Sequence, residues 1–280
     1  MFELEKINLT KIESDSLVYS HKITKNPTMM NFSSHAHDVC EIVLILRGDV
    51  SYIVEGKSYK LKKGDVVLSH PSVLHRIRPD GNETYERYTV LYDEKKLPRS
   101  LYKKIPKDVD VFRSEDGRAI EEIFDKINAY SKLFSGEELA HIAKNLIEEI
   151  FFILANSEAI SRDSSTNPLV SRALSYITEH LTEIRNISEI CDALYITKSH
   201  LHHLFINNIQ MSPKQYINSK KLIKARKLIR KGGKPTEIYT LCGFDDYATF
   251  FRNYKKYFGY KPSEEDVSVK RKEVIISVEP

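Results

Sequence analysis

The sequence predicts an α+β protein of two domains: an antiparallel β-barrel followed by two helices, and then an all-helical domain with two helix-turn-helix units. Three observations support this prediction. Short runs rich in β-branched and aromatic residues alternate with turns early in the chain, apolar residues then take helical spacing, and two helix-turn-helix patterns occupy the last third. A chain of 280 residues is long enough for two separate cores.

Residues 1–112 are expected to form the β-barrel. Apolar runs such as 42–45 and 50–54 are separated by turn sequences, which are Arg47-Gly48-Asp49, Glu55-Gly56-Lys57 and Lys63-Gly64-Asp65. Short apolar runs at this spacing are typical of an antiparallel barrel or sandwich.

Residues 113–158 are predicted to form two amphipathic helices. Their apolar residues recur at three- and four-residue spacing, at Ile120, Ile123, Phe124 and Ile127 and then at Leu139, Ile142, Leu146, Ile150, Ile153 and Leu154. These stripes can pack on the barrel or on a second copy of the chain. The second helix is the better candidate for a homodimer contact, and a solution mass of one chain at micromolar concentration would contradict that expectation.

Two polar segments flank the last domain. Residues 159–167 crowd Ser, Asp and Asn together, which is typical of an interdomain linker. Residues 267–280 form a tail to which the sequence assigns no role.

The composition favours a cytoplasmic protein that does not span a membrane. The three cysteines are far apart in apolar contexts, and no stretch reaches the roughly 18 apolar residues that cross a bilayer. The net charge of +4 conceals a polarised chain, because residues 212–261 hold 13 Lys or Arg and three acidic residues. Basic residues concentrated in one helical domain favour a polyanionic partner.

Residues 168–266 contain the two helix-turn-helix units, at 187–205 and 238–254. Thr197 is the expected N-cap of the second helix of the first unit, and Gly243 supplies the positive backbone angle for the turn of the second. The second helix of such a unit enters the major groove of double-stranded DNA. Its outward residues are therefore candidate DNA contacts, namely Lys198, Ser199, His202 and His203 in the first unit and Tyr247, Phe251, Arg252, Lys255 and Lys256 in the second.

These contacts are expected to divide between bases and phosphates. Arg252 is the main candidate to read a base, through bidentate contact with guanine. The lysines are better placed for phosphates or for the general electrostatic field than for bases, and this group comprises Lys220, Lys221, Lys224, Lys255 and Lys256.

The stretches ISEICDALYITKSHLHHLF, MSPKQYINSKKLIKARKLI and EIYTLCGFDDYATFFRNYKKYFGYKP together resemble the DNA-binding domain of the AraC/XylS transcription regulators. In that family, two units held by one rigid linker helix read successive major grooves on one side of the DNA. The resemblance implies a sequence-specific regulator, expected to be an activator that contacts RNA polymerase, and not an enzyme. This chain departs from the family pattern at His203, Ile206, Gln210, Tyr239 and the Glu265-Asp266 pair.

In the first domain, His35, His37 and Glu41 stand in the order His-x-His-x3-Glu, and His75 follows later. This pattern resembles that of the cupins. Positions two apart on a strand share a face, so these side chains can project into one barrel lumen. Three nitrogens and one oxygen suit a divalent transition metal such as zinc, manganese, iron or nickel. The second half departs from the cupin pattern, because Val73 stands where a glycine is usual and the gap before His75 is one residue short.

Three interpretations of this cluster stay open: a metal site, a pocket for a small organic effector, or histidines that only satisfy hydrogen bonds inside the barrel. Sensor domains that resemble this one more often have the pocket, and no cofactor is then required. Convergent polar groups in an apolar barrel also favour it. The candidate effector residues are His35, His37, Glu41, Arg47, Tyr52, His70 and His75, with Arg76 nearby.

A ligand-responsive transcription regulator is the leading hypothesis for function, and the resemblance most often implies a sugar or related carbohydrate as effector. The alternative is a metal-dependent cupin enzyme, such as a dioxygenase or isomerase, with a helical accessory domain. A third possibility is a helical module whose basic face binds an acidic protein. The sequence has no Gly-rich phosphate loop, no Gly-x-Ser-x-Gly and no His-Glu-x-x-His.

Overall fold

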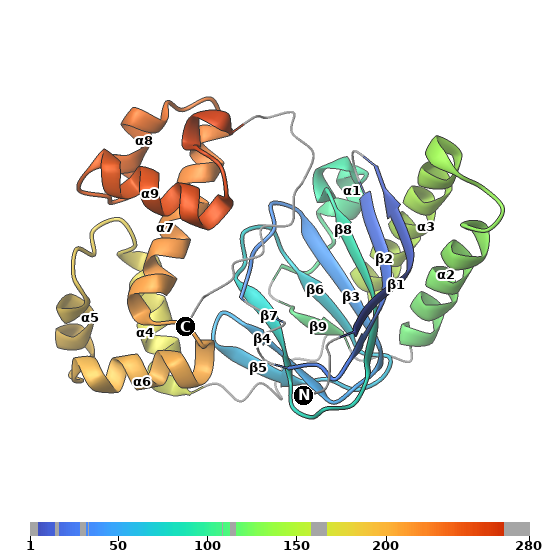
Figure 1. The fold of residues 1–280 in the computed structure, drawn as a ribbon, viewed down its shortest axis with the longest axis horizontal. Coiled ribbons are helices and arrows are strands. Elements are labelled where there is room, and N and C mark those ends of the chain that lie inside the picture. Colours follow the sequence, from blue (N-terminus) through green and yellow to red (C-terminus); the bar gives the residue numbers. More distant parts are fainter. Residues whose placement is uncertain are drawn as a thin grey trace. The chain divides into compact units, whose positions relative to one another are not determined.

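The computed structural model describes residues 5–14, 17–28, 32, 34–107, 109–112, 116–157 and 167–265 (Figure 1). The chain divides into two compact units, a β-rich unit and a helical unit. The α+β fold class predicted from the sequence is confirmed. Residues 159–166 of the linker expected at 159–167, and the tail at 267–280, lie outside the described residues.

The β-rich unit contains two sheets. The larger has the strand order β1-β2-β8-β3-β6-β9 and the smaller the order β5-β4-β7. The strands are β1 (Glu5–Glu13), β2 (Leu17–Lys25), β3 (Cys40–Arg47), β4 (Val50–Val54), β5 (Lys57–Lys60), β6 (Val66–Ser69), β7 (His75–Pro79), β8 (Tyr85–Tyr92) and β9 (Val111–Phe112). Neighbouring strands in the larger sheet run antiparallel, as the sequence predicts.

Strand alternation gives the larger sheet two different faces. On one face, Ile42 and Leu44 of β3 share a core with Phe124 and Phe151 of the helices. These helices are α2 (Asp116–Tyr130) and α3 (Gly136–Asn156), and they lie on one side of the larger sheet (Figure 1). The two predicted amphipathic helices are therefore confirmed. A short helix, α1 (Arg99–Tyr102), precedes them.

The other face of the larger sheet lines the interior between the two sheets. Val43 and Ile45 of β3 share a second core with Tyr52 and Val54 of β4. Glu41 lies on this interior face, because it is two residues before Val43 on the same strand. A polar side chain is thereby placed among apolar ones.

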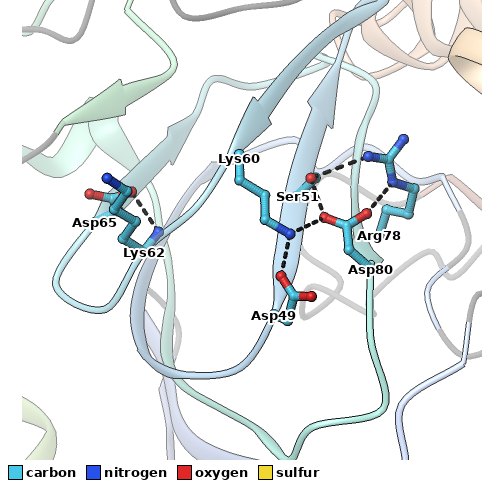
Figure 2. A network of polar contacts seen from close by, with 7 residues as sticks. All are labelled: Asp49, Ser51, Lys60, Lys62, Asp65, Arg78 and Asp80. Carbon is cyan, nitrogen blue, oxygen red and sulfur yellow. Dashed lines mark hydrogen bonds and ion pairs between the residues drawn. The ribbon is translucent and has the colours of Figure 1, made fainter.

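A polar network joins the strands of the smaller sheet on its other side (Figure 2). Asp80, just after β7, accepts hydrogen bonds from Ser51 of β4, from Lys60 of β5 at 2.8 Å and from Arg78 of β7 at 2.7 Å. The Lys60 ammonium also pairs with Asp49. Because Lys60 is largely exposed, we expect this network to add little to the free energy of unfolding. Its main effect is to fix the ends of the three strands relative to one another.

The helical unit consists of α4 (Pro168–Glu179), α5 (Ile187–Leu194), α6 (Lys198–Ile209), α7 (Pro213–Ile229), α8 (Pro235–Leu241), α9 (Tyr247–Phe258) and the 3-10 turn η3 (Pro262–Glu264). Side-chain caps define where its helices begin. Thr197 accepts a hydrogen bond from the His200 amide at 3.1 Å, which confirms its predicted N-cap role. Asn186 and Ser212 form capping boxes at α5 and α7. None of the helices in the described ranges has the length and apolar character needed to cross a membrane.

Candidate functional site

The first helix-turn-helix unit consists of α5 and α6. Ile190, Cys191, Leu201 and Leu204 are buried between its helices, as the sequence pattern requires. The four outward residues predicted on α6 are all exposed, namely Lys198, Ser199, His202 and His203. Only Lys198 among them carries a permanent positive charge.

The turn of this unit contains a feature that the sequence pattern did not reveal. Tyr195 caps α5 with φ 57° and ψ 45°, and its side chain is 93% exposed. A non-glycine residue in the left-handed region costs about 1–2 kcal/mol. The second unit has Gly243 at its turn, with φ 79°, and avoids this cost.

The second unit consists of α8 and α9, and its outward face is more basic. Arg252, Lys255 and Lys256 are exposed, and Arg252 donates a hydrogen bond to the Thr249 hydroxyl at 3.1 Å. Tyr247 and Phe251 are half-buried, and their rings lie 6.2 Å apart. These two aromatic side chains thus leave only part of their surface available to a partner.

Helix α7 carries the predicted phosphate-binding lysines, and it places them differently. Lys224 is exposed and Lys220 is half-buried. Lys221 is buried, and its ammonium donates to the carbonyls of Ile184 and Gly243, both at 2.8 Å. Burial lowers the pKa of Lys221. The expectation that Lys221 contacts phosphate is therefore wrong, because its amine holds two backbone segments of the domain together.

Glu265 connects the end of the helical unit to α7, the helix between the two helix-turn-helix units. Its side chain is 2% exposed and accepts hydrogen bonds from Arg226 at 3.3 Å and Arg230 at 2.6 Å on α7. The hydroxyls of Tyr254 and Tyr260 also donate to it. The sequence marked Glu265 only as a departure from the family, and two of the basic residues counted in the segment 212–261 serve this internal carboxylate.

In the β-rich unit, the structure brings together the predicted His/Glu cluster, which comprises His35, His37, Glu41 and His75. One ligand atom from each lies within 4.8 Å of the others. His75 Nε2 is 2.9 Å from Glu41 Oε2, and His37 Nε2 is 3.8 Å from the same oxygen. His35 and His75 exchange two backbone hydrogen bonds of 2.9 Å, which places His75 in the cluster despite the irregular spacing before it.

The electrostatics of the cluster favour a neutral imidazole beside a carboxylate. Burial lowers the pKa of His37 to about 3, and His37 Nε2 has no hydrogen-bond partner among the described residues. Burial alone would raise the pKa of Glu41, but the hydrogen bond with His75 and the neighbouring imidazoles hold it well below its usual range. A neutral nitrogen and an ionised oxygen are the forms that coordinate a cation or accept a hydroxyl proton.

The other predicted effector residues lie at different distances from this cluster. Tyr52 is beside it, with its ring centroid 6.0 Å from that of His75 and its hydroxyl 2.7 Å from Ser69 Oγ. Arg47 is six residues from Glu41 along β3, which separates them by roughly 20 Å, and it is exposed. The Nε2 atom of His70 lies 2.9 Å from the Pro106 carbonyl oxygen, so this side chain interacts with the backbone near Pro106. Arg76 follows His75 on β7, so alternation directs the two side chains to opposite faces. The structure therefore brings only Tyr52 of these four to the cluster.

Comparison with known proteins agrees with this organisation. A family model described as a helix-turn-helix domain matches residues 190–265, and one described as an AraC-like ligand binding domain matches residues 18–174. The chain is 23% identical over 243 residues to the HTH-type transcriptional activator RhaS of Escherichia fergusonii, covering 83% of this chain and 87% of that protein. It is 25% identical over 236 residues to the arabinose operon regulatory protein of Salmonella typhimurium, and the match covers 79% of this chain and 81% of that protein.

Two solved structures also align with this chain over most of its length. The AraC-like transcriptional activator CuxR aligns with a TM-score of 0.40 at 12% identity and covers 85% of each chain. ToxT from Vibrio cholerae O395 aligns with a TM-score of 0.37 at 15% identity, covering 90% of this chain and 97% of that one.

The match to the ligand-binding domain spans more than half of the chain, and the helix-turn-helix match follows it. This order reproduces the β-rich unit followed by the helical unit. Because both matches are to domains of transcription regulators, they exclude the metal-dependent enzyme that was considered as an alternative. The chain belongs to the AraC family of DNA-binding transcription regulators.

Proposed function

We propose that this chain is a sequence-specific transcriptional activator whose affinity for promoter DNA changes when a small molecule binds inside the β-rich unit. The main support is the pair of helix-turn-helix units with exposed cations on α6 and α9. The similarity to the HTH-type transcriptional activator RhaS supports the activator assignment. An activator also needs a contact with RNA polymerase, which belongs to this proposal.

Ligand control requires the effector to favour one arrangement of the protein over another. We include a homodimer in the proposal, formed through α3, because Phe152 of that helix is 51% exposed. Ile142, Leu146 and Ile153 of the same helix are only partly buried. Effector binding can then change the arrangement of the two domains or of the two subunits, and with it the affinity for DNA.

The DNA-binding part of this proposal is tested at Arg252. Replacement of Arg252 by alanine is expected to weaken specific binding by about 1–3 kcal/mol, roughly 5- to 150-fold, and to relax discrimination at one base pair, because a bidentate guanine contact is lost. Fluorescence anisotropy with a site selected from random DNA measures this loss. The matched control is Arg172→Ala on α4, which removes an exposed arginine outside both units. Equal affinities for wild type and Arg252→Ala would contradict the assignment.

We propose that the effector is a small carbohydrate that contacts the His/Glu cluster. The name of the arabinose operon regulatory protein supports this class. Hydroxyl groups fit a site that offers the Glu41 carboxylate as acceptor and the neutral, unpaired Nε2 of His37. In this form the site needs no metal.

A divalent transition metal is the second candidate occupant of the cluster. Ligand atoms about 2.1 Å from a tetrahedral zinc ion lie roughly 3.4 Å from one another, so donors within 4.8 Å would have to move closer together to bind it. If metal is bound, purified chain dialysed against zinc should retain about one equivalent, and Glu41→Gln should lower zinc affinity at least about tenfold. Tyr52→Phe is the control, since it removes a neighbouring hydroxyl that is not in the donor set. Retention far below one equivalent, unchanged in Glu41→Gln, would exclude the metal.

A further inference from the structure

Strand β8 places two hydroxyl groups on the interior face that also carries Glu41. Tyr85 belongs to the core between the two sheets, together with Val43 of β3. Thr89 is paired with Val43 in the larger sheet, and the side chains of directly paired residues share a face. Both side chains therefore point to the interior of the β-rich unit, and neither was predicted from the sequence.

The hydroxyl groups of Tyr85 and Thr89 have no hydrogen-bond partner among the described residues. Tyr85 is fully buried and Thr89 is 6% exposed. Buried polar groups are nearly always hydrogen-bonded in native proteins. Tyr52 and Ser69 show the usual situation in the same interior, because their hydroxyls lie 2.7 Å apart and satisfy each other. The two unsatisfied hydroxyls on β8 therefore point to a partner from outside the chain.

Thr89 lies close to the His/Glu cluster. Glu41 is paired with Leu91, and Thr89 is two residues before Leu91 on β8. Such diagonal neighbours on adjacent strands lie roughly 7–8 Å apart. A metal ion held by the cluster would leave Thr89 unpaired, because its hydroxyl is not among the atoms that converge there. A molecule with several hydroxyl groups can contact both Thr89 and the cluster.

The Tyr85 ring is held in place although its hydroxyl is unpaired. The Arg87 guanidinium lies over the ring, 4.5 Å from its centroid, and the Phe32 ring packs edge-on at 5.7 Å. Burial raises the pKa of the Tyr85 hydroxyl, the charge of Arg87 lowers it, and the charge of Glu41 raises it further. The field of the Glu41 carboxylate thus extends to Tyr85. A hydroxyl on a ring that is already fixed loses little freedom when it binds a ligand.

The unpaired groups are suited to ligands that carry hydroxyl groups and no negative charge. A hydroxyl group both donates and accepts hydrogen bonds, and so does a hydroxyl of the ligand, whereas an ionised carboxylate only accepts. The Glu41 carboxylate attracts a hydroxyl proton and repels an anion. The set as a whole therefore favours a neutral polyhydroxylated molecule.

We infer that Tyr85 and Thr89 form a second hydroxyl-binding subsite of the effector site, and that the effector is a neutral sugar or sugar alcohol that spans this subsite and the His/Glu cluster. This inference rests on the proposed function and adds two residues that select the hydroxyl pattern of the effector. A ligand that lacks the matching hydroxyl would leave a buried group of the protein unpaired, which lowers affinity.

The ligand-free chain provides the first test, for which the effector need not be known. Tyr85→Phe and Thr89→Val each remove a buried hydroxyl without a partner and keep the side chain close to its original size. Neither should lower the thermal unfolding midpoint, because no internal hydrogen bond is lost. Tyr52→Phe is the matched control and should lower the midpoint, since it leaves the Ser69 hydroxyl unpaired. Midpoints lowered as far in both β8 variants as in Tyr52→Phe would overturn the inference, because the two hydroxyls would then have partners within the fold.

Ligand binding provides the second test. The midpoint of the full chain is measured with arabinose, xylose, glucose, galactose, mannose and sorbitol at equal concentrations. At least one of these compounds should raise the midpoint in a saturable way, and its affinity should fall at least about tenfold in Tyr85→Phe and in Thr89→Val. The control Tyr195→Phe removes a hydroxyl from an exposed side chain of the helical unit and should leave the affinity unchanged.

Two outcomes separate this inference from the proposed function. A sugar whose binding is weakened by Glu41→Gln but unchanged in both β8 variants would overturn the inference and leave the proposed carbohydrate effector intact. A panel in which no compound raises the midpoint would overturn the inference and the carbohydrate effector together.

Discussion

Replacement of Gly243 by alanine is expected to destabilise the helical unit by at least about 3 kcal/mol and to abolish DNA binding. Gly243 has φ 79°, and a Cβ atom there would lie 2.4 Å from the Thr182 carbonyl oxygen and 2.9 Å from two further backbone atoms. Backbone atoms cannot move aside as a flexible side chain can. The substitution would also displace the Gly243 carbonyl, which accepts hydrogen bonds from Lys221 and Arg185.

Gly259 provides the matched control for this prediction. It has φ 81°, but a Cβ atom there would meet nothing within 4 Å. Gly259→Ala should therefore cost only the left-handed conformation, about 1–2 kcal/mol. Hydrogen exchange of the α7 amides in the full chain measures both values. Equal costs at the two positions would show that the close approach to Thr182 is not a constraint.

Replacement of Glu265 by alanine should have a comparable effect, about 3–5 kcal/mol, because it leaves the charges of Arg226 and Arg230 without their internal carboxylate. The side chains of Glu265 and Arg226 are only 2% and 8% exposed. Glu265→Gln retains the shape and should lose less. The control is Glu237→Gln, an exposed position on α8, which should change the unfolding free energy little.

The contribution of Glu265 should also depend on pH. Burial alone would raise its pKa, but the hydrogen bond from Tyr254 and the charge of Arg226 hold the pKa below the usual value of 4.5. A carboxyl whose pKa is lower in the folded state stabilises the fold above its unfolded pKa. That stabilisation is lost as the pH falls through the folded pKa. The difference in unfolding free energy between wild type and Glu265→Gln should therefore shrink on acidification from pH 7 to pH 3, and a difference independent of pH would contradict this account.

Features set by local sequence were predictable. Thr197 as an N-cap, Gly243 at a turn and the outward face of α9 follow from residue type and helical spacing. The convergence of His35 and His37 on Glu41 was expected from strand periodicity, but both histidines lie before β3, and His35 forms only an isolated bridge with His75. Each of these predictions needed only the few neighbouring residues.

Features set by tertiary contacts were not predictable. Nothing near Lys221 in the sequence distinguishes it from Lys224, yet one is buried against Ile184 and the other is exposed. Glu265 depends on partners 35 and 39 residues away. The interior position of Thr89 depends on the register of β8 with β2 and β3, which the sequence alone does not specify.

Helix α7 connects the two helix-turn-helix units, and we expect it to hold both in position to contact the same DNA molecule. It has 17 residues and is about 25 Å long. Selection of binding sites from random-sequence double-stranded DNA by the full chain tests this claim most directly. The expected result is an enriched site with two sequence blocks, their centres about one helical turn or 10 base pairs apart. Enrichment of a single block, or no enrichment over the starting pool, would contradict it.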